Sequence, residues 1–350
     1  MMFPNIEKFP INWENGMKLS SDYFHHLEDS IEDSIRDTRA FTIQAIGNFG
    51  LLPNSAFEIQ NSKGIESNSV RVSLKACRAL LPGGNRVEII SKNIEQLQIP
   101  LEAPFVEFAP SSNTKYHVFL CVDSNERVKV GIPKTRPIRL SYMCPDYRLE
   151  YLTNDKFKSI ANVVSPNRMK IAEWKDGKLS EAYIPACLAI KGFPLLERWY
   201  VFFKNQIENI IRLGISIVGE NRNKYKAKCE FCIPIIHYLR MTKGYFDWKL
   251  PQESPVELAV YFGNLAGLLK GTLETGDRDF VRNYLKNGNV NNLIKYIDYF
   301  LSPKAINREG IAETFSIVSS LIKSLIDTLV FLSSNTGPII KDGDRNLSAG

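Results

Sequence analysis

The chain has 350 residues, of which 44% are apolar and 23% are charged. This length predicts about two domains, and the composition is typical of a soluble globular protein. The net charge of +6 is small for so long a chain, and two short basic clusters, residues 127–136 and 222–228, are interpreted as solvated loops or helix ends. A nucleic-acid partner is therefore not expected. The sequence shows no secretory signal, and charges interrupt the apolar run at residues 311–332, so we expect a cytoplasmic protein.

The first predicted elements are an extended segment, residues 8–19, and a helix that follows it. Ser20 or Ser21 is suited to cap this helix. An acidic run at residues 28–33 is expected to form the solvent-exposed side of the helix. Apolar residues recur at spacings of three and four on another face, which predicts an apolar stripe: Phe24, Leu27, Ile31 and Ile35.

From residue 41 to residue 188 the pattern indicates short strands. Residues 70–74 alternate apolar and polar side chains with the period of two that a half-buried strand shows. Asp176-Gly177 lies between two apolar runs, and this dipeptide predicts a hairpin. About eight short strands without intervening helices predict an antiparallel sandwich or barrel. The other predicted strands are at residues 86–90, 116–122, 138–143, 168–175 and 179–185.

After Pro194 the pattern becomes that of helices. The segment Ser254-Pro255-Val256-Glu257 has the form of a capping box, and shorter helices are predicted at residues 277–286 and 290–301. In the helix after Pro194 and in a last helix at residues 308–334, apolar residues alternate spacings of four and three. This repeat is typical of helices that pack against near-parallel partners. We call these positions the seam residues: Tyr200, Phe203, Ile207, Ile210, Ile311, Phe315, Val318, Ile322, Leu325 and Leu329.

No catalytic constellation is found in the sequence. The common motifs of hydrolases, metalloproteases and nucleotide-binding loops are absent, and residues 81–85 read as a turn. Only four histidines are available for a catalytic triad. Cys229 and Cys232 have C-x-x-C spacing without a second pair or a nearby histidine pair, so they are interpreted as structural. We expect no enzymatic activity, no cofactor and no metal.

Three segments together resemble one known family. Residues 13–25 open with Trp-Glu-Asn-Gly-Met-Lys-Leu and continue to Tyr-Phe-His. They are similar to the W-x-x-G-M-x-L … H-F opening of TssK, the baseplate subunit of type VI secretion systems, with Phe and His in reversed order. Residues 183–190 resemble its I-P-P-x-L-x-I junction, with Ala186 in place of the second proline. Residues 254–267 are similar to its H-P-x-E-L-Y … L-A-G helix.

The resemblance implies an α+β protein with two domains. Residues 1–191 would form an antiparallel β-sandwich shell domain, related to the shoulder domain of phage receptor-binding proteins, and residues 192–336 a helical bundle stalk. It also implies a homotrimer in which the seam residues are buried between subunits. Residues 337–350 are expected to be a tail, and the C-terminal head domain of the family is expected to be absent, as in the variant systems of Bacteroidota.

The same resemblance implies the partners. The shell domain would dock on TssF and TssG wedge subunits, and the baseplate would be linked to a membrane-anchor complex at the inner membrane. Large apolar residues often dominate interface energies, and glycine permits a turn. Trp13 has an alternative role, holding the first strand to the sandwich. The candidate wedge-contact residues are Trp13, Gly16, Met17, Leu19 and Phe24.

A second class of function stays open. A sandwich of the phage-tail type would bind a receptor or a carbohydrate, with Tyr142, Tyr147 and Tyr151 lining a groove. Cross-strand packing explains these three tyrosines equally well. Glycan binding by residues 1–190, without affinity for wedge proteins, would favour this function.

Overall fold

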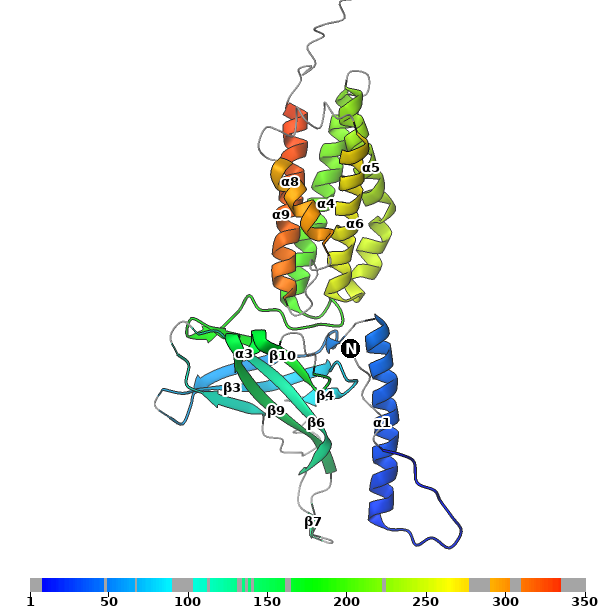
Figure 1. The fold of residues 1–350 in the computed structure, drawn as a ribbon, viewed down its shortest axis with the longest axis vertical. Coiled ribbons are helices and arrows are strands. Elements are labelled where there is room, and N and C mark those ends of the chain that lie inside the picture. The colour runs from blue at the N-terminus through cyan, green and yellow to red at the C-terminus, as the bar shows by residue number, and fades with distance from the viewer. Residues whose placement is uncertain are drawn as a thin grey trace, which may run out of the picture. The chain divides into compact units, whose positions relative to one another are not determined.

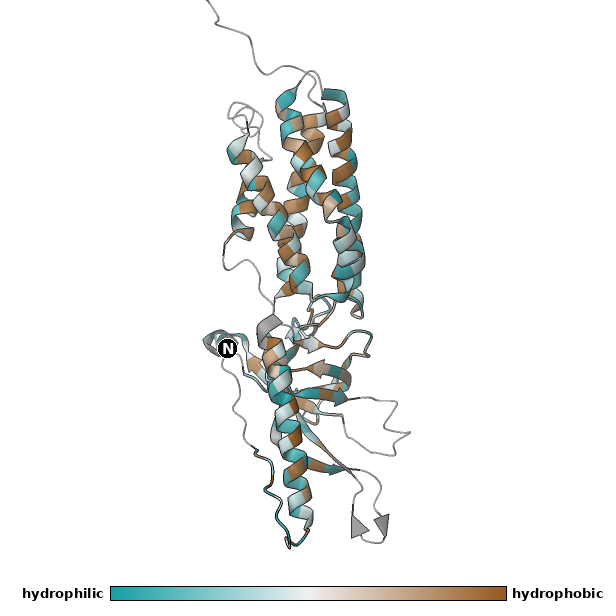
Figure 2. Ribbon diagram, turned by 90° about the vertical axis from the view of Figure 1, so that its right-hand side faces the viewer, coloured by the Kyte–Doolittle hydropathy of each residue, from teal (hydrophilic) through white to brown (hydrophobic). Residues whose placement is uncertain are grey.

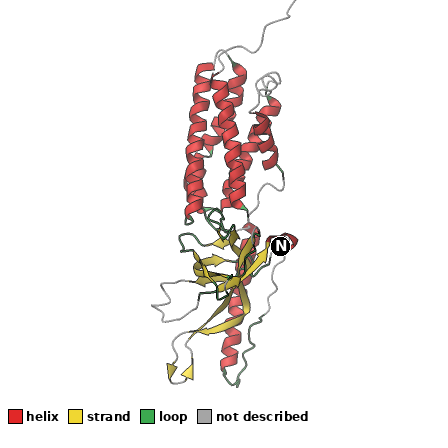
Figure 3. Cartoon of the chain, turned by 90° about the vertical axis from the view of Figure 1, so that its left-hand side faces the viewer, coloured by secondary structure: helices red, strands yellow, loops and turns green. Residues whose placement is uncertain are grey.

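A computed structural model describes residues 8–46, 49–66, 68–89, 103–111, 114–130, 134–135, 138–139, 142–160, 165–221, 225–276, 290–302 and 310–334. The chain folds as two compact units, Met1–Phe193 and Pro194–Gly350. The first, the sheet unit, contains all the described strands, and the described elements of the second, the helical unit, are helices (Figures 1 and 3). Strands and helices are thus segregated along the chain, which confirms the predicted α+β class.

The sheet unit begins with an extended segment, residues 8–20, which we call the N-terminal strap. It makes one turn, in which the Met17 amide donates to the Glu14 carbonyl (3.2 Å). Gly16 lies in this turn with φ +86°, a conformation that a side chain would disfavour. The helix α1 (Ser21–Ile46) follows, and the Ser20 hydroxyl caps it by accepting from the Tyr23 amide (3.4 Å). The predicted extended segment and helix start are confirmed.

Two antiparallel sheets make up most of the sheet unit. In the first, β3 is central and pairs with β1, β2, β4 and β5, and in the second the order is β11-β10-β6-β9. A small separate hairpin joins β7 to β8. The strands are β1 (Gly50–Leu51), β2 (Glu58–Lys63), β3 (Val70–Leu80), β4 (Arg86–Ile89), β5 (Phe105–Phe108), β6 (Tyr116–Val130), β7 (Lys134–Thr135), β8 (Ile138–Arg139), β9 (Tyr142–Thr153), β10 (Arg168–Lys175) and β11 (Lys178–Leu179), with a short helix α3 (Asn154–Ile160) after β9.

The hairpin predicted at Asp176-Gly177 is confirmed. Asp176 and Gly177 both have positive φ, +52° and +78°, as the turn between two directly paired strands requires. The strand predicted at residues 179–185 is wrong beyond Leu179. After that residue the Ser180 amide donates to Glu173, and the Tyr183 amide then donates back to Ser180 in a turn.

Aromatic residues connect the two sheets. The ring of Phe108, in β5, lies 4.9 Å from the ring of Tyr116, in β6, and 6.0 Å from that of Trp174, in β10. All three side chains are buried. Because β5 belongs to the first sheet and β6 and β10 to the second, these contacts are part of a core that both sheets share.

The helical unit is built from long helices that pack side by side. α4 contacts α5 and α9, and α9 also contacts α6 and α8. The Ser254 hydroxyl caps α6, although it accepts from the Val256 amide (3.3 Å) and not from Glu257 as predicted. The helix predicted at residues 277–286 lies outside the described residues. The described helices are α4 (Pro194–Asn221), α5 (Lys226–Met241), α6 (Pro255–Thr275), α8 (Val290–Phe300) and α9 (Ile311–Ser334), with a π-helical turn, Tyr245–Lys249, and a 3-10 turn, Leu250–Gln252, between α5 and α6.

The seam residues lie inside the helical unit of a single chain. Phe203 and Phe315 are fully buried, and their rings are 5.6 Å apart, with Phe262 of α6 5.1 Å from Phe203. Tyr200 is half-buried and donates its hydroxyl to the Phe246 carbonyl (3.1 Å). The expectation that other copies cover this seam is corrected, because side chains without exposed surface offer nothing to a second chain. The other buried seam residues are Ile207, Ile210, Ile311, Val318, Ile322, Leu325 and Leu329.

The same burial explains the apolar character of α9. Among the described helices it is the one whose length and composition would suit a membrane span, and half of its most apolar stretch is buried within the protein. Figure 2 shows apolar residues along the helices of this unit. Packing against α4, α6 and α8 accounts for them in α9.

Candidate interaction site

Helix α1 turns its polar side toward the sheets. Ser30, Asp33 and Ala40 are buried on this side, and the Asp33 carboxylate pairs with Arg36 and accepts from the Lys8 amide (3.0 Å). The prediction that the acidic run forms the exposed side of the helix is confirmed for Glu28 and Glu32, which are exposed, and is wrong for Asp33. An amphipathic pattern defines two faces, but electrostatic partners elsewhere in the chain decide which face is covered.

The main electrostatic partner is Arg127, in β6. Its guanidinium lies 2.7 Å from Asp29 and 2.8 Å from Glu32. The register of the β6–β9 ladder shifts between Asp123 and Arg127, and such irregularities commonly redirect a side chain. Arg127 is four-fifths buried, so it is not part of a solvated loop as the basic cluster suggested.

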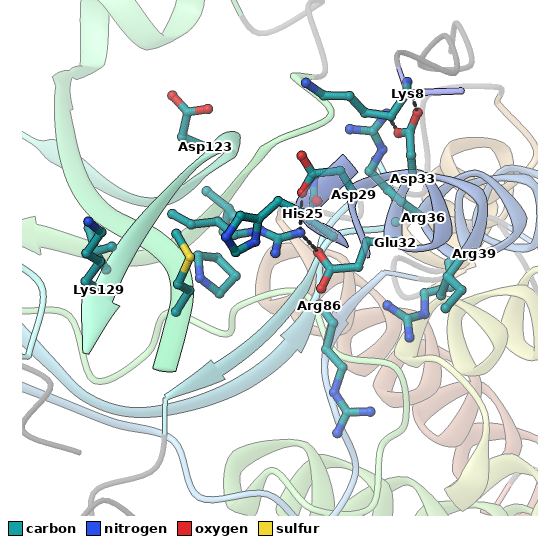
Figure 4. Close-up of a pocket in the computed structure, with 18 residues that line it drawn as sticks. Lys8, His25, Asp29, Glu32, Asp33, Arg36, Arg39, Arg86, Asp123 and Lys129 are labelled. Carbon is teal, nitrogen blue, oxygen red and sulfur yellow. Dashed lines mark hydrogen bonds and ion pairs between the residues drawn. The ribbon is translucent and has the colours of Figure 1, made fainter. Parts of the chain in front are cut away.

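The ion pairs border a cleft of about 900 Å³ between α1 and the sheets (Figure 4). Basic and acidic side chains both line it, and many of them pair with one another. Figure 4 shows Asp29, Glu32 and Asp33 on α1 directed toward basic partners. The ion pairs at the border of this cleft therefore hold α1 on the sheet unit. Its charged lining comes from Lys8, Asp29, Glu32, Asp33, Arg36, Arg39, Arg86, Asp123, Arg127 and Lys129.

A close backbone approach also fastens α1. Gly84, in the predicted turn between β3 and β4, has φ +84°. A Cβ atom at this position would overlap the carbonyl oxygen of Arg36 and approach the amide of Ala40. Only glycine allows both this conformation and this contact, so the turn and the helix pack backbone to backbone.

The apolar side of α1 consequently faces away from the sheets. Ile31 is 51% exposed and Phe24 is 50% exposed, whereas Ile35 borders the cleft. Leu27 is half-buried. A helix that leaves these apolar side chains exposed presents an apolar surface for another protein segment.

The N-terminal strap extends this apolar surface. Trp13 is 43% exposed, and its ring lies 6.2 Å from Tyr23 and 6.4 Å from Phe24. Leu19 is exposed and Met17 is half-buried. The structure thus brings Trp13 and Phe24 together at the start of α1. The ring contacts of Trp13 are made to the helix, which does not match the alternative role of holding a strand to the sandwich.

The buried polar cluster around His117 does not have the form of a catalytic site. Burial lowers the pKa of the His117 imidazole to about 4, and the side chain is only 2% exposed. Its Nδ1 lies 3.6 Å from Glu173, which itself pairs with Lys170 (2.6 Å) and Lys115 (2.8 Å). No substrate reaches an imidazole that is covered in this way. The cluster joins β6 to β10 as an internal ion-pair network.

Cysteine and metal chemistry find little support in the part of the chain that the structure describes. Cys229 and Cys232 are both buried in α5, and burial raises the pKa of the Cys232 thiol to about 12. Such thiols are poor nucleophiles and poor metal ligands. Over the described residues, no group of three or more His, Cys, Asp or Glu side chains has the geometry to hold a metal ion.

Of the three tyrosines proposed to line a glycan groove, Tyr147 packs within the protein, and Tyr151 is partly covered, with 41% of its surface exposed. The Tyr147 hydroxyl accepts from the Glu88 amide (3.2 Å), and burial raises the pKa of Tyr147 to about 12. Tyr151 stacks on Phe108 with ring centroids 4.8 Å apart. The side chain of Tyr142 lies outside the described residues. Packing between the sheets therefore explains Tyr147 and the ring face of Tyr151 that contacts Phe108.

Solved structures of TssK share this fold. The crystal structure of TssK superposes with a TM-score of 0.55 over 90% of this chain and 69% of that chain, at 12% identity. TssK of the EAEC type VI secretion system, in complex with nanobody nb18, gives 0.54 over 86% and 68%, at 13% identity. A chain of the TssK-TssF-TssG baseplate subcomplex, solved by cryo-electron microscopy, gives 0.51 over 92% and 100%, at 13% identity.

No model of a known protein family matches the sequence, and no curated protein does. The similar structures are those of TssK and of type VI secretion baseplate complexes. This chain shares the fold of TssK. The resemblance read from the sequence motifs is confirmed at the level of the fold.

Proposed function

We propose that this protein is a non-enzymatic adaptor in the baseplate of a type VI secretion system. In this role three copies form a homotrimer, the sheet unit acts as a β-sandwich shell that docks on TssF/TssG-like wedge subunits, and the helical unit acts as a bundle stalk. The proposed domains are residues 1–191 and 192–336, with residues 337–350 as a tail. The adaptor works in the cytoplasm and links the baseplate toward the membrane-anchor complex.

The exposed apolar side chains of the strap and of the first turn of α1 carry this proposal. Trp13, Leu19 and Phe24 are 43%, 62% and 50% exposed, and all three lie in the region that resembles the opening of TssK. Exposed aromatic groups of this kind are typical anchors of protein interfaces. The turn at Gly16 and the half-buried Met17 hold the strap in shape around them.

The fold comparison supports the choice of partner. The matched chain of the TssK-TssF-TssG subcomplex is covered over its whole length. A protein with this fold and an exposed apolar strap is suited to bind wedge subunits through that strap. The ion-paired cleft behind α1 supports the same role, since it holds the helix that bears Phe24 firmly on the sheets.

The test is capture of purified TssF/TssG-like wedge proteins by the purified chain. Trp13→Ala should weaken capture at least tenfold, about 1.4 kcal/mol, as expected for an interface anchor. Trp248→Ala is the matched control, because Trp248 is 80% exposed in the helical unit. Wild-type affinity in Trp13→Ala, with a fold unchanged by circular dichroism, would contradict the assignment of the strap.

A further inference from the structure

The cleft between α1 and the sheets carries more positive than negative charge. Six basic side chains and four carboxylates are among its lining residues, which leaves an excess of two positive charges. A concave surface with an excess of one sign of charge concentrates ions of the opposite sign. The cleft is therefore electrostatically suited to an anion.

Most of the carboxylates in the cleft are already neutralised within the protein. The Arg127 guanidinium lies 2.7 Å from Asp29 and 2.8 Å from Glu32. Asp33 pairs in turn with Arg36. Because opposite charges at such short range largely cancel each other's field, these two arginines and three carboxylates neither attract nor repel a ligand strongly.

Three other basic side chains of the cleft keep their charge available. They come from three elements, with Lys8 in the N-terminal strap, Arg39 in α1 and Lys129 in β6 (Figure 4). Within the described residues, none of their charged groups makes a hydrogen bond or an ion pair. Lys8 and Arg39 are also half-buried. A cation that has lost part of its hydration without gaining a partner favours the binding of an anion.

The apolar part of the lining indicates what else the ligand contains. Ile35 of α1, Val128 of β6 and Met143 of β9 line the same cleft and are 42%, 37% and 44% exposed. The volume of about 900 Å³ lies within the usual range of small-molecule sites. A ligand that fills this space combines negative charge with an apolar body, which an inorganic anion lacks.

We propose that this cleft binds a small phosphorylated organic molecule of the size of a nucleotide. One phosphate ester carries a charge of about −1.5 to −2 at pH 7, which matches the excess positive charge of the lining. The three unpaired cations bind the phosphate groups, where the arginine offers two parallel hydrogen bonds and each lysine a point charge. The apolar side chains cover the organic part. Because the ligand joins the strap, α1 and β6, it stabilises the sheet unit on binding.

Isothermal titration calorimetry on the full chain tests this site, with ADP as the probe and pyrophosphate for comparison. ADP should bind more tightly than pyrophosphate, because only ADP has an organic part that contacts the apolar side chains. ADP should also raise the unfolding temperature of the protein. Absence of ADP binding at a concentration of about 1 mM, or equal affinity for the two probes, would overturn the proposal.

Charge-removing variants locate the bound probe. Arg39→Gln should weaken ADP binding about tenfold, as expected for the loss of a charge-assisted hydrogen bond. Lys129→Gln should weaken it about threefold, because this lysine is exposed. Lys178→Gln is the matched control, since Lys178 is an exposed strand lysine outside the cleft.

If Arg39→Gln keeps both the wild-type circular dichroism spectrum and the wild-type affinity for ADP, the ligand binds elsewhere and the assignment fails. The inference goes beyond the baseplate role and does not depend on it. Wedge capture should stay at the wild-type level in Arg39→Gln and Lys129→Gln, so the failure of one proposal is distinguishable from the failure of the other.

Discussion

Helices α1 and α9 carry the same kind of apolar repeat and use it in opposite ways. In α9, Phe315 has no exposed surface, and its ring lies 6.0 Å from Trp199 of α4. In α1, Ile31 occupies an equivalent place in its repeat and is half exposed. The repeat of α9 builds the core of one chain, whereas that of α1 remains at the surface. A heptad pattern therefore reports that a helix packs against helices, but not whether these belong to the same chain.

The difference follows from what surrounds each helix. α9 is uncharged along most of its length, and α4, α6 and α8 all pack on it. α1 has a strongly acidic side, and Arg127 offers that side two close ion pairs. A partly buried ion-pair network and a close backbone contact together set the orientation of α1. The apolar side of α1 is therefore not covered by the sheets and is accessible to a partner.

The strongest test of this comparison is a pair of truncations, Phe315→Ala and Ile31→Ala. Phe315→Ala should lower the free energy of unfolding by about 3–5 kcal/mol, the usual cost of removing a buried phenyl ring. This loss should be the same at every protein concentration. Ile31→Ala should have a smaller effect, which grows with concentration as the assembly forms. Urea unfolding over a hundredfold concentration range measures both.

A large, concentration-independent loss in Ile31→Ala would break the comparison, because Ile31 would then belong to the core of one chain. If Phe315→Ala lowers the free energy of unfolding by less than about 1 kcal/mol, the comparison also fails, because Phe315 would then not be a core residue. Truncation of a core phenyl ring normally costs several times more.

A smaller effect is expected when α1 is pushed away from the sheets. Gly84→Ala combines an unfavourable positive φ with overlap on the α1 backbone, so we expect a destabilisation of about 1–3 kcal/mol. Faster hydrogen exchange within residues 29–43 should accompany it. Gly177→Ala is the matched control, because Gly177 has a similar φ of +78° but open space around its Cα.

The difference between the two glycine variants isolates the steric contact with α1. If both variants destabilise equally and exchange in α1 is unchanged, the backbone contact at Gly84 does not hold the helix.

The last expected effect is a pH dependence that arises in the sheet unit and is absent near neutral pH. Burial places the pKa of folded His117 at about 4, below its ordinary value of 6.5. The unfolded chain therefore binds more protons between these values, and stability falls as the pH drops from about 6.5 to about 4. One such group contributes at most about 1.4 kcal/mol per pH unit.

His117→Gln removes this group, so its stability should change less steeply with pH over the same window. Urea unfolding at pH steps from 7 to 4 measures the slope. His25→Gln removes an exposed imidazole instead and should keep the wild-type slope. An unaltered slope in His117→Gln would show that other groups carry the acid sensitivity.

Local signals predicted most of the elements. The start of α4 after Pro194, the cap of α6 at Ser254 and the hairpin at Asp176-Gly177 all depend on neighbouring residues, and all three are confirmed. α8 confirms the shorter helix predicted at residues 290–301. Caps and turns act within a few residues, so the sequence displays them directly.

The candidate site was predicted less completely. The strap residues were identified by motif, and Trp13 and Phe24 do lie together. The role of Arg127 was missed, because its partners Asp29 and Glu32 are almost a hundred residues away in the chain. The one available signal was the contrast within α1, where carboxylates are concentrated on one side and the apolar stripe is free of charge.

Taken by itself, the amino-acid sequence determined where helices and strands form and that α1 and α9 each have an apolar face. Only the tertiary structure decided which of these faces is covered, since that depends on residues far away in the chain. Gly84 and Arg127 hold the polar side of α1 against the sheets, while α4, α6 and α8 surround α9. Periodicity is a local property, and burial is a property of the whole fold.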